Sequence, residues 1–404
     1  MIEVRVPTSK SLTQRALVLA ALAPGRSVVA DPLDCDDSRV LRRALSALGV
    51  HITKTEEGLA VDGGNPLRAP GETLDLGNAG TAMRFCTGLA LLTDGPVAID
   101  GDEAMRRRPM PGLLSGLRSL GARVQERGRP ACPPITVHPP ADLADLPGAV
   151  VLDAAGSSQQ VSALLLTASR LPAGLTIEVA GDLPSRPYVD LTLDSLADFG
   201  VAVDTEPGPE GQTVYRVRPS TLRAASVTIE GDHSSASYPL AAGFLTGRSV
   251  RVVNVRADSR QGDRVFGSLL EGLGRPAPRT FDLFDTPDIA PTLATCALFA
   301  QGETRLTGLA HLRIKECDRL SVLAAGFRRV GADIDEVPDG LVIHPTRLRD
   351  DVDLDPALDP ALDHRMAMCF ALLGLRLPGI RVANPDCVSK SYPTFYEMLE
   401  LFAP

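Results

Sequence analysis

The chain has 404 residues, of which 44% are hydrophobic and 4% aromatic, and its formal net charge is -9. A chain of this length exceeds the size at which one hydrophobic core keeps growing, so two domains are expected. The negative charge argues against non-specific binding to nucleic acid or to an acidic membrane surface. The absence of tryptophan also disfavours base-stacking platforms. Any anion that this protein binds must therefore be met by local clusters of cations.

The sequence shows no run of about 18 apolar residues and no signal-peptide pattern at Met1, which predicts a soluble, cytoplasmic protein. Its seven cysteines are an odd number without a Cys-x-x-Cys pair. Reduced thiols fit that pattern better than a disulfide framework or a zinc site. No metal is implied.

A pattern of about 40 residues recurs six times along the chain, which is typical of a repeat architecture. Each repeat opens with a small or polar turn and continues into a helix rich in Ala and Leu, expected at 16–23, 86–92, 161–168, 238–245, 293–300 and 366–375. In five repeats a strand-like stretch and a second amphipathic helix follow, ending at Leu48-Gly49, Leu120-Gly121, Phe199-Gly200, Leu273-Gly274 and Val330-Gly331. After the glycine comes a β-rich stretch, as at 201–204, 332–335 and 340–344. Repeats of this size and content predict α/β units, three to each domain.

Lysine is rare, with four examples among 41 basic residues. Three of the four, Lys10, Lys315 and Lys390, lie inside dense polar motifs, whereas Lys54 does not. An ammonium group is a compact charge whose pKa can be tuned for proton transfer, while a guanidinium stays charged and binds as a planar fork. The three lysines are therefore candidates for chemistry that arginine performs badly.

The polar openings of the repeats precede helices, so backbone N–H groups and positive helix ends are expected to point at a ligand. Hydroxyls, amides and cations gather in these openings and in the loops before the second helices: Lys10, Ser11, Arg15, 77–84, 106–109, 156–159, 185–188, 231–237, 315–319, 363–365 and 389–390. Such a set predicts a site for a multiply anionic, oxygen-rich substrate. Asp288 and Glu316 stand among these cations and are candidates for proton transfer.

Each feature also has a purely structural explanation. Ser157 and Ser234 are typical helix N-caps, 106–108 is typical of a solvated basic run, and 363–365 of an ion pair at a helix start. His364 alone fits a hydrogen-bonded helix-terminal residue better than a catalyst. The functional interpretation is favoured because the rare lysines and the polar loops occur together. Independent helix caps would not place the lysines in the same recurrent loops.

Nine motifs occur in order along the chain: 7–11 with Arg15, 77–84, 105–109, 157–159, 185–188, 230–238, 313–320, 363–368 and 390–393. Over essentially the whole chain they resemble the motifs of the EPSP synthase (3-phosphoshikimate 1-carboxyvinyltransferase) family of enolpyruvyl transferases. The resemblance implies an α/β fold of two similar domains, each of three βαβαββ units, with the active site in the interdomain cleft. It places the first domain at 9–229 and the second at 1–8 plus 230–404.

The resemblance implies that the enolpyruvyl group of phosphoenolpyruvate is transferred to the 5-hydroxyl of shikimate 3-phosphate. A tetrahedral intermediate forms and then expels phosphate, as a step of the shikimate pathway to chorismate and the aromatic amino acids. The two substrates are the expected partners, with no nucleic acid or membrane, and the chain is expected to be a monomer. No metal or organic cofactor is needed, because a cationic site itself stabilises the charge. The herbicide glyphosate is expected to bind where phosphoenolpyruvate does.

The motif positions also imply a role for each matching residue. Shikimate 3-phosphate is expected to contact Lys10, Ser11, Arg15, Ser157, Ser158, Gln159, Ser185, Tyr188, Asp288, His311 and Lys315. Phosphoenolpyruvate is expected to contact Lys10, Gly80, Arg108, Gln159, Arg319, Arg365 and Lys390. By the same resemblance, Asp288 takes the hydroxyl proton, Glu316 protonates the methylene carbon and later removes a proton from it, and Lys10 shares the proton traffic.

Four positions depart from the family pattern. Thr8 stands where glycine is usual, Phe85 where proline commonly follows Met-Arg, Cys317 where Ser or Thr is common, and His311 where an asparagine can contact substrate. None of these changes removes a charged catalytic group. Phe85 is expected to shift the helix that carries Gly80 and Thr81.

Three alternative functions are weighed against this one. The sister enzyme that acts on UDP-N-acetylglucosamine carries a catalytic cysteine in a loop that here reads 101–109 without one. RNA 3'-terminal phosphate cyclases use related repeats but need a histidine nucleophile and favour a basic surface. A non-enzymatic repeat scaffold would fit if the clustered charges were merely solvated. Phosphate release from shikimate 3-phosphate and phosphoenolpyruvate separates all of these.

Overall fold

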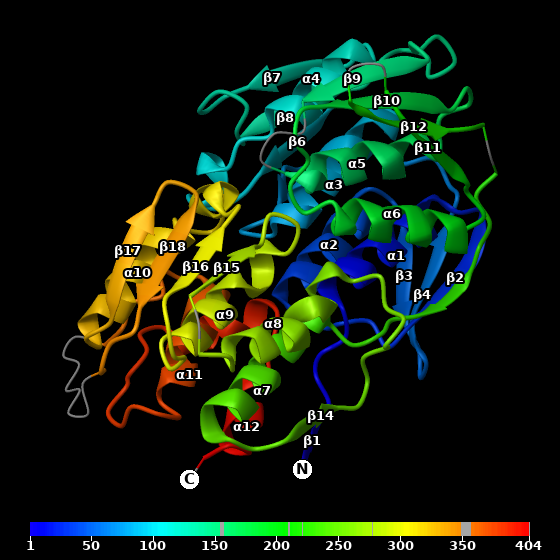
Figure 1. Cartoon of the computed structure of the whole chain (residues 1–404). Coiled ribbons are helices and arrows are strands. Elements are labelled where there is room, and N and C mark those ends of the chain that lie inside the picture. The colour runs from blue at the N-terminus through cyan, green and yellow to red at the C-terminus, as the bar shows by residue number, and fades with distance from the viewer. Residues whose placement is uncertain (154–156, 209–210, 220, 277, 349–356, 404) are drawn as a thin grey trace. The chain divides into compact units, whose positions relative to one another are not determined.

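The computed structural model describes residues 1–403 except 154–156, 209–210, 220, 277 and 349–356 (Figure 1). The chain divides into two compact units, Thr8–Ile229 and Met1–Pro7 with Glu230–Pro404. We call the first the continuous unit and the second the split unit. The limits expected from the sequence, 9–229 and 1–8 plus 230–404, stay a prediction.

Within its described residues, the continuous unit holds three four-stranded sheets of one common topology. In each, two parallel strands are extended by an antiparallel hairpin, in the orders β13-β2-β4-β3, β5-β6-β8-β7 and β9-β10-β12-β11. The strands are β2 (Gly25–Ala30), β3 (His51–Lys54), β4 (Gly58–Gly63), β5 (Leu74–Asp75), β6 (Val97–Asp100), β7 (Arg123–Glu126), β8 (Ile135–His138), β9 (Ala149–Asp153), β10 (Leu175–Ala180), β11 (Val203–Pro207), β12 (Thr213–Val217) and β13 (Ser226–Thr228). Because β13 comes last in the chain but pairs with β2, it closes the first repeat just before the chain leaves this unit.

Two kinds of helix alternate in the continuous unit. They are α1 (Lys10–Leu22), α2 (Asp36–Ala47), α3 (Gly80–Leu89), α4 (Pro111–Ser119), α5 (Ser158–Ala168) and α6 (Pro187–Asp198), with the short turns η1 (Ala90–Leu92) and η2 (Met105–Arg107). Helices α1, α3 and α5 are buried along most of their length, whereas α2 buries one face and exposes the other. A helix that is apolar all round belongs in a core, so α1, α3 and α5 form the centre of the unit. One hydrophobic cluster joins them to the inner faces of the sheets.

The split unit repeats this plan less completely. Its described strands are β1 (Ile2–Val4), which pairs in parallel with β14 (Val250–Val252), and a sheet in the order β15 (Arg279–Asp282), β16 (Thr304–Thr307), β18 (Gly340–His344) and β17 (Asp333–Val337). Its helices are α7 (His233–Thr246), α8 (Phe266–Leu273), α9 (Ala290–Ala297), α10 (Arg319–Arg329), α11 (His364–Leu373) and α12 (Phe395–Glu400), with η3 (Gly262–Val265), η4 (Pro287–Ile289), η5 (Ala310–Ile314) and η6 (Pro385–Lys390). Helix α10 packs on the β17–β18 hairpin (Figure 1). A second hydrophobic cluster fills this unit.

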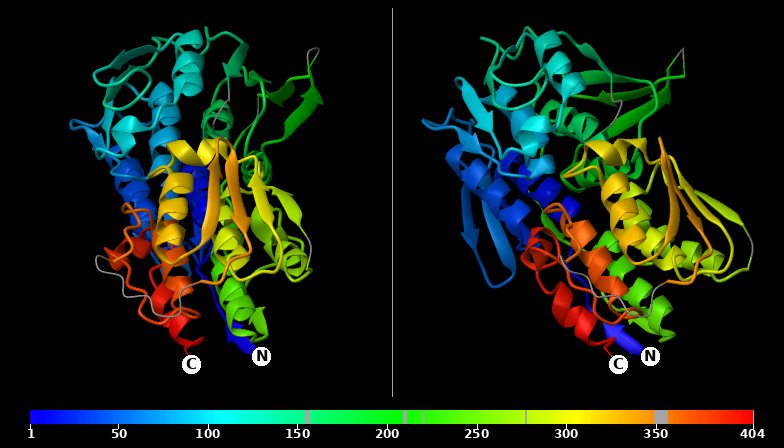
Figure 2. Two further views of the ribbon diagram at one scale, coloured as in Figure 1. Left: turned by 60° about the vertical axis from the view of Figure 1, so that its left-hand side comes forward. Right: turned by 90° about the vertical axis from the view of Figure 1, so that its left-hand side faces the viewer.

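The two chain ends lie side by side in the split unit, as both views of Figure 2 show. Ile2 N donates to Ser249 O at 2.8 Å, and the neighbouring Arg248 donates to the carbonyls of Leu401 and Ala403 at 3.1 and 3.3 Å. The two segments of the split unit next to which the chain passes between the units, near Val6 and near Gly231, also meet there. Asn254 pairs with both backbone groups of Val6, at 3.0 and 2.8 Å, and its carbonyl accepts from Gly231 N at 2.8 Å.

The predicted α/β fold is confirmed, and all six Ala- and Leu-rich helices are present. They begin earlier than predicted, because the polar residues of the openings form the first helical turns instead of preceding them. In α1, for example, Ser9 is the N-cap and accepts from Leu12 N at 3.4 Å, so Lys10 is already helical. The fourth repeat departs from the expected pattern, because no antiparallel hairpin is seen between α8 and β15 among the described residues.

The closing glycines reflect this difference. Gly49, Gly121, Gly200 and Gly331 have φ between 82° and 93° and each precedes a hairpin. Gly274 has φ -68° and no hairpin follows it in the described residues. A left-handed residue at the end of a helix turns the chain back, and glycine adopts that conformation without steric cost.

We expect Gly49→Ala to lower the free energy of unfolding by about 1–2 kcal/mol, because alanine resists the left-handed conformation. A Cβ at Gly49 would otherwise make only ordinary contact, 3.6 Å from Arg68 Cγ. Gly274→Ala is the matched control and should be neutral or slightly stabilising, since its backbone is already helical. Urea titration of both variants provides the measurement. Equal losses would show that φ does not decide the cost.

Candidate active site

Arg15 is the most buried cation of the continuous unit, with 2% of its surface exposed. Nε donates to Thr192 Oγ1 at 2.8 Å, Nη1 to Ser11 O at 2.9 Å, and Nη2 to Tyr188 O at 2.8 Å and Ser162 Oγ at 3.3 Å. Within the described part of the chain, all of these partners are neutral oxygens. Burial lowers the pKa of Arg15 to about 10, so it is still charged at neutral pH. A buried cation held by neutral groups is well placed to meet an anionic ligand.

Phe85 lies beneath this arginine. Its ring is 1% exposed, and the Arg15 Cζ is 5.6 Å from the ring centroid, which is within cation–π range. From the sequence, Phe85 is expected to act indirectly, by shifting the helix that carries Gly80 and Thr81. The structure adds a direct contact between α3 and α1.

The start of α3 lies against the loop that follows η2. A Cβ at Gly80 would be 2.6 Å from Arg108 Nη2, so glycine leaves the space that the Arg108 guanidinium occupies. Arg108 also donates to Asn78 Oδ1 at 3.3 Å. Gln159, in the first turn of α5, donates to Thr81 Oγ1 at 3.2 Å. These contacts bring Gly80, Arg108 and Gln159 together as predicted residues of one cluster.

Arg84 holds the loop that follows η2 in place. Its Nη2 donates to the carbonyls of Arg108 and Pro109, at 3.2 and 3.3 Å, and its Nη1 to Gly80 O at 3.4 Å. Arg84 is 3% exposed. It therefore ties the backbone of Arg108 to the helix start that carries Gly80.

The predicted hydroxyl groups lie at the starts of α5 and α6. Ser157 is the N-cap of α5 and accepts from Gln159 N at 3.3 Å, and Ser158 is the first helical residue. Ser185 has a φ of 58°, a conformation that is rare for serine and that marks a functional constraint in many proteins. Tyr188 follows in the first turn of α6, and its carbonyl accepts from Arg15. Gly156 of the predicted motif lies outside the described residues.

Lys10 has a partner that the sequence did not indicate. Its Nζ donates to Asp37 Oδ2 at 2.9 Å, and the side chains of Lys10 and Asp37 are 19% and 6% exposed. Asp37 is in the first turn of α2, where acidic residues are common because they complement the helix dipole. Because an acidic residue in a first helical turn is common, the sequence alone did not indicate that Asp37 pairs with Lys10.

In the split unit, Arg319 is the centre of a buried cluster of charges. It is 2% exposed and donates to three carboxylates: Nε to Asp363 Oδ2 at 2.7 Å, Nη1 to Asp288 Oδ1 at 3.2 Å, and Nη2 to Glu316 Oε2 at 3.0 Å. Burial alone would lower the pKa of Arg319, but these three carboxylates outweigh it and hold the pKa far above its usual value. Arg319 is therefore permanently charged.

The same carboxylates also bind the other cations of this unit. Asp288 Oδ2 accepts from Arg365 Nη2 at 2.8 Å, and Glu316 Oε1 accepts from Lys390 Nζ at 3.0 Å. Burial would raise the pKa of Asp288, but Arg365, Arg319 and Lys315 hold it well below its usual range. Five predicted site residues thus form one connected network in the split unit.

His311 adds a neutral imidazole to this surface. It is 8% exposed, and its Nε2 has no hydrogen-bond partner among the described residues. Burial, together with Lys315, lowers the pKa of His311 to about 4. At neutral pH it is therefore uncharged and offers either a donor or an acceptor to a ligand, depending on its tautomer.

Asp263 was not predicted as part of the site. It is 3% exposed in η3, and its Oδ2 accepts from the hydroxyl of Ser234 in α7. Burial, and then Asp288, raise the pKa of Asp263 to about 7. Ser234 was a candidate N-cap, but Asp232 caps α7 instead, accepting from Ser235 N at 2.7 Å.

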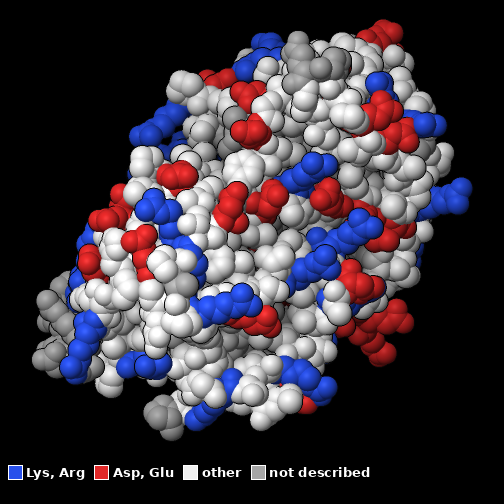
Figure 3. All heavy atoms as spheres, in the orientation of Figure 1, with Lys and Arg blue, Asp and Glu red and all other residues white. Residues whose placement is uncertain are grey.

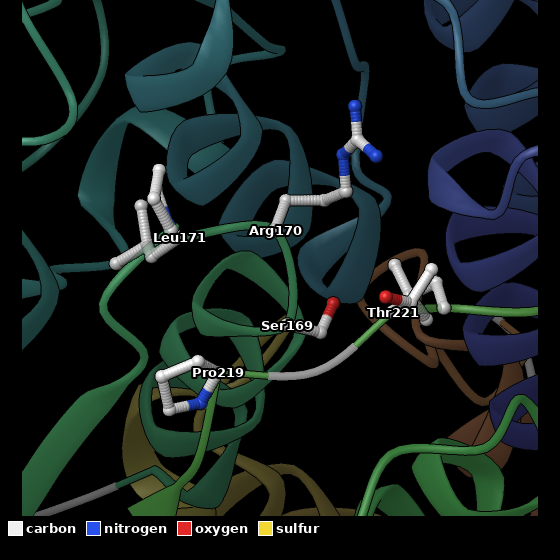
Figure 4. A pocket seen from close by; sticks show the side chains of 7 residues that line it. Ser169, Arg170, Leu171, Pro219 and Thr221 are labelled. Atoms are coloured by element: carbon white, nitrogen blue, oxygen red, sulfur yellow. The ribbon is translucent and has the colours of Figure 1, made fainter.

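The remaining surface features do not extend these clusters. On the face shown in Figure 3, acidic and basic side chains are interspersed. The hollow in Figure 4 contains none of the predicted site residues and is lined by Ser169, Arg170, Leu171, Pro172, Pro219, Thr221 and Leu222. There Arg170 donates to Gly64 O at 3.4 Å, a contact within the continuous unit.

Three further findings concern the described residues. All seven cysteines are free thiols. Among these residues, no group of three or more His, Cys, Asp or Glu is arranged to hold a metal ion. None of the helices seen is long and apolar enough to cross a bilayer.

Together, these features define a class of protein. Both units are built from α/β repeats, and the first turns of their helices carry cations, hydroxyls and acidic groups suited to proton transfer. That combination is typical of enzymes that act on small, multiply anionic substrates.

The comparisons with known proteins identify the family. The model of the family described as EPSP synthase (3-phosphoshikimate 1-carboxyvinyltransferase) matches residues 2–280 and 275–399. The chain is 38% identical over 413 residues to a 3-phosphoshikimate 1-carboxyvinyltransferase of Methanosphaerula palustris, covering 97% of this chain and 95% of that one. It is 39% identical over 417 residues to one of Shewanella denitrificans, covering 98% and 94%. The solved EPSP synthase from Acinetobacter baumannii has a TM-score of 0.78 at 26% identity, covering 100% and 95% of the two chains. The chain belongs to the EPSP synthase family.

Proposed function

We propose that this chain transfers the enolpyruvyl group of phosphoenolpyruvate to the 5-hydroxyl of shikimate 3-phosphate and releases phosphate, acting as a cytoplasmic monomer. Family membership supports the reaction. The observation that carries the proposal is the network around Arg319, in which Asp288 and Glu316 accept hydrogen bonds from three cations proposed to bind phosphoenolpyruvate.

For shikimate 3-phosphate, the proposed ligands are cations and hydroxyl groups. Arg15 supplies a buried charge for the carboxylate, with Ser11 beside it in α1. Ser157, Ser158 and Ser185 offer hydroxyls to the phosphate, and Lys315 offers an ammonium group. The remaining members of the proposed set are Lys10, Gln159, Tyr188, Asp288 and His311.

For phosphoenolpyruvate, the proposed set separates two anionic groups. Arg319 and Arg365 bind the carboxylate as planar forks, and Lys10, Arg108 and Lys390 surround the phosphate. Gly80 lies beside Arg108, and Gln159 donates to Thr81, the residue after Gly80. Five cations are thereby assigned to one small substrate, which is enough to stabilise a phosphate as it leaves.

The proposed reaction has two proton-transfer stages. The 5-hydroxyl oxygen attacks C2 of phosphoenolpyruvate, giving its proton to Asp288, while C3 receives a proton from Glu316. The C2–O bond to phosphate then breaks, and the leaving phosphate takes the proton held by Asp288. C3 returns a proton to Glu316 as the double bond forms again, so both carboxyl groups regain their starting protonation states. By family resemblance, Lys10 shares this proton traffic, and its Nζ is hydrogen-bonded to Asp37.

Phosphate release tests the proposal directly. Purified protein mixed with shikimate 3-phosphate and phosphoenolpyruvate should release inorganic phosphate, and omission of either substrate should abolish release. Replacing shikimate 3-phosphate with UDP-N-acetylglucosamine is the control for the sister activity. Release with UDP-N-acetylglucosamine but not with shikimate 3-phosphate would reject the proposal. Release with neither acceptor would also reject it.

We expect Lys10→Arg to lower kcat/KM at least about tenfold although the charge is kept, because a guanidinium is a weak proton carrier and cannot reproduce the point-charge geometry. The same loss is expected for Lys315→Arg and Lys390→Arg. Lys54→Arg is the matched control, since Lys54 belongs to no motif. Unchanged kinetics in all three site variants would contradict the special role of lysine.

We also expect glyphosate to compete with phosphoenolpyruvate, more weakly than in relatives that carry proline in place of Phe85. Phe85→Pro should lower the inhibition constant measured at fixed shikimate 3-phosphate. Because the proline variant also removes a ring that packs on Arg15 and a donor inside α3, Phe85→Leu is the matched control. Inhibition that is no tighter in Phe85→Pro than in Phe85→Leu would contradict this expectation.

A further inference from the structure

The candidate carboxylates and cations of the split unit neutralise one another. Three cations, Arg319, Arg365 and Lys390, are bonded to three carboxylates, Asp288, Glu316 and Asp363, at 2.7 to 3.2 Å. The proposed function asks Arg319, Arg365 and Lys390 to bind a substrate that carries its own carboxylate and phosphate. The acidic side chains already in place therefore stand where substrate anions must go.

The three carboxylates differ in how accessible they are. The side chain of Asp363 is 0% exposed, and it also caps α11 by accepting from Arg365 N at 2.8 Å. The side chain of Asp288 is 23% exposed, and that of Glu316 is 9% exposed. Asp363 is therefore a permanent counter-ion, while Asp288 is the partner that a solute reaches most easily.

The donors that they occupy are the ones that a ligand carboxylate needs. A carboxylate binds a guanidinium best through two parallel hydrogen bonds to both terminal nitrogens. On Arg319, Asp288 binds Nη1 at 3.2 Å and Glu316 binds Nη2 at 3.0 Å. Asp363 binds Nε at 2.7 Å and makes a longer contact with Nη2 at 3.5 Å. A ligand can form the two-bond arrangement on the terminal nitrogens when it displaces Asp288, Glu316 or both, and Asp363 can remain in place.

We propose that Asp288 and Glu316 are internal competitors of the substrate carboxylate, and that its binding to Arg319 and Arg365 releases them for proton transfer. This inference rests on the proposed function and adds an order of events to it. Asp288 holds the arginines in the ligand-free protein and becomes a proton acceptor when the ligand takes them over.

The electrostatics of the cluster agree with that order. While Arg365, Arg319 and Lys315 hold the pKa of Asp288 well below its usual range, its carboxylate is too weak a base for a hydroxyl proton. A substrate carboxylate on the same arginines neutralises them, so burial then raises the pKa of Asp288. The base therefore gains strength when the substrate is in place.

Binding of phospholactate, the saturated analogue of phosphoenolpyruvate, tests the competition without turnover. Calorimetry on Asp288→Asn should show phospholactate binding tightened by about tenfold relative to wild type, because one charged hydrogen-bond partner no longer has to be displaced. Inorganic phosphate, which has no carboxylate, should bind Asp288→Asn and wild type equally. In a turnover assay the same variant should have a lower kcat together with a lower KM for phosphoenolpyruvate.

Glu316→Gln is the second variant and gives a different pattern. Glu316 holds both Arg319 and Lys390, so its loss should tighten the binding of phospholactate and of inorganic phosphate. Glu336→Gln is the matched control, because Glu336 pairs with Arg313 elsewhere in the split unit and should alter neither affinity. A melting temperature for each variant confirms folding.

The outcomes separate this inference from the proposed function. Unchanged or weaker phospholactate binding in folded Asp288→Asn and Glu316→Gln would overturn the competition, even if the wild type releases phosphate normally. Equal tightening for phospholactate and inorganic phosphate in Asp288→Asn would also overturn it, because the effect would then be a general loss of negative charge. Selective tightening supports it, whether or not shikimate 3-phosphate proves to be the acceptor.

Discussion

Replacing Arg319 with alanine should lower the free energy of unfolding by about 3–5 kcal/mol, because it leaves buried carboxylates without their shared counter-ion. The largest cost is that of leaving the Asp363 carboxylate unpaired, since its side chain is 0% exposed and Arg319 Nε lies 2.7 Å from its Oδ2. Urea titration gives the change in stability. Phosphate release should be lost together with it, because the proposed carboxylate-binding fork is gone.

Arg313→Ala is the matched control for this prediction. Arg313 also pairs with two carboxylates, at 2.9 Å from Asp318 and 2.6 Å from Glu336, but its side chain is 26% exposed. Water can solvate the carboxylates that it leaves, so a loss of about 1 kcal/mol or less is expected. A similar loss in both variants would show that burial does not determine the value of the Arg319 network.

Much of the fold could be predicted because its signals are local. The Ala- and Leu-rich helices and the closing glycines are read from neighbouring residues, and Gly49 and Gly331 do adopt the left-handed conformation that glycine favours. Gly274 also follows a leucine at a helix end, but Arg-Pro-Ala-Pro comes after it instead of a β-rich stretch, and its φ is -68°. The pairing of distant strands, such as that of β13 with β2, is the part of the fold that the local sequence does not contain.

The candidate site shows the same division between local and distant information. Lys10 and Arg319 were conspicuous because their motifs are dense and polar. Their counter-ions Asp37 and Asp363 lie 27 and 44 residues away and occupy helix starts, where acidic residues are ordinary. Sequence reasoning therefore found the cations and underestimated the carboxylates that hold them.

This asymmetry has a physical cause. Burying a cation costs free energy in the ligand-free protein unless an internal carboxylate accompanies it. Arg15 is met instead by neutral oxygens such as Thr192 Oγ1, at 2.8 Å. Arg15 thus keeps a buried charge held by neutral groups for its ligand, whereas Lys10 and Arg319 are paired with internal carboxylates.

Asp263→Asn should change how stability depends on pH. Asp263 has a pKa of about 7 in the folded protein, raised from 3.8 by burial and by Asp288, while Ser234 and Arg365 act in the opposite direction and Asp232 adds a further negative charge. Between these two values the folded state holds a proton that the unfolded state has released. The contribution of this group is therefore fully present below about pH 4 and is lost as the pH rises through about 7.

The rise of the Asp263 pKa from 3.8 to about 7 corresponds to about 4 kcal/mol at most, so Asp263→Asn should gain stability over wild type by up to that amount as the pH rises from about 4 to 7. His311 gives the opposite slope, because its pKa is lowered from 6.5 to about 4 and the unfolded state then binds more protons. His311→Asn is therefore the matched control, with a gain over wild type that grows as the pH falls. Urea titrations of both variants and wild type across this range give the differences directly. A difference between Asp263→Asn and wild type that stays constant with pH would mean that Asp263 titrates normally, and that the negative charge of Asp288 does not reach it through the buried cluster.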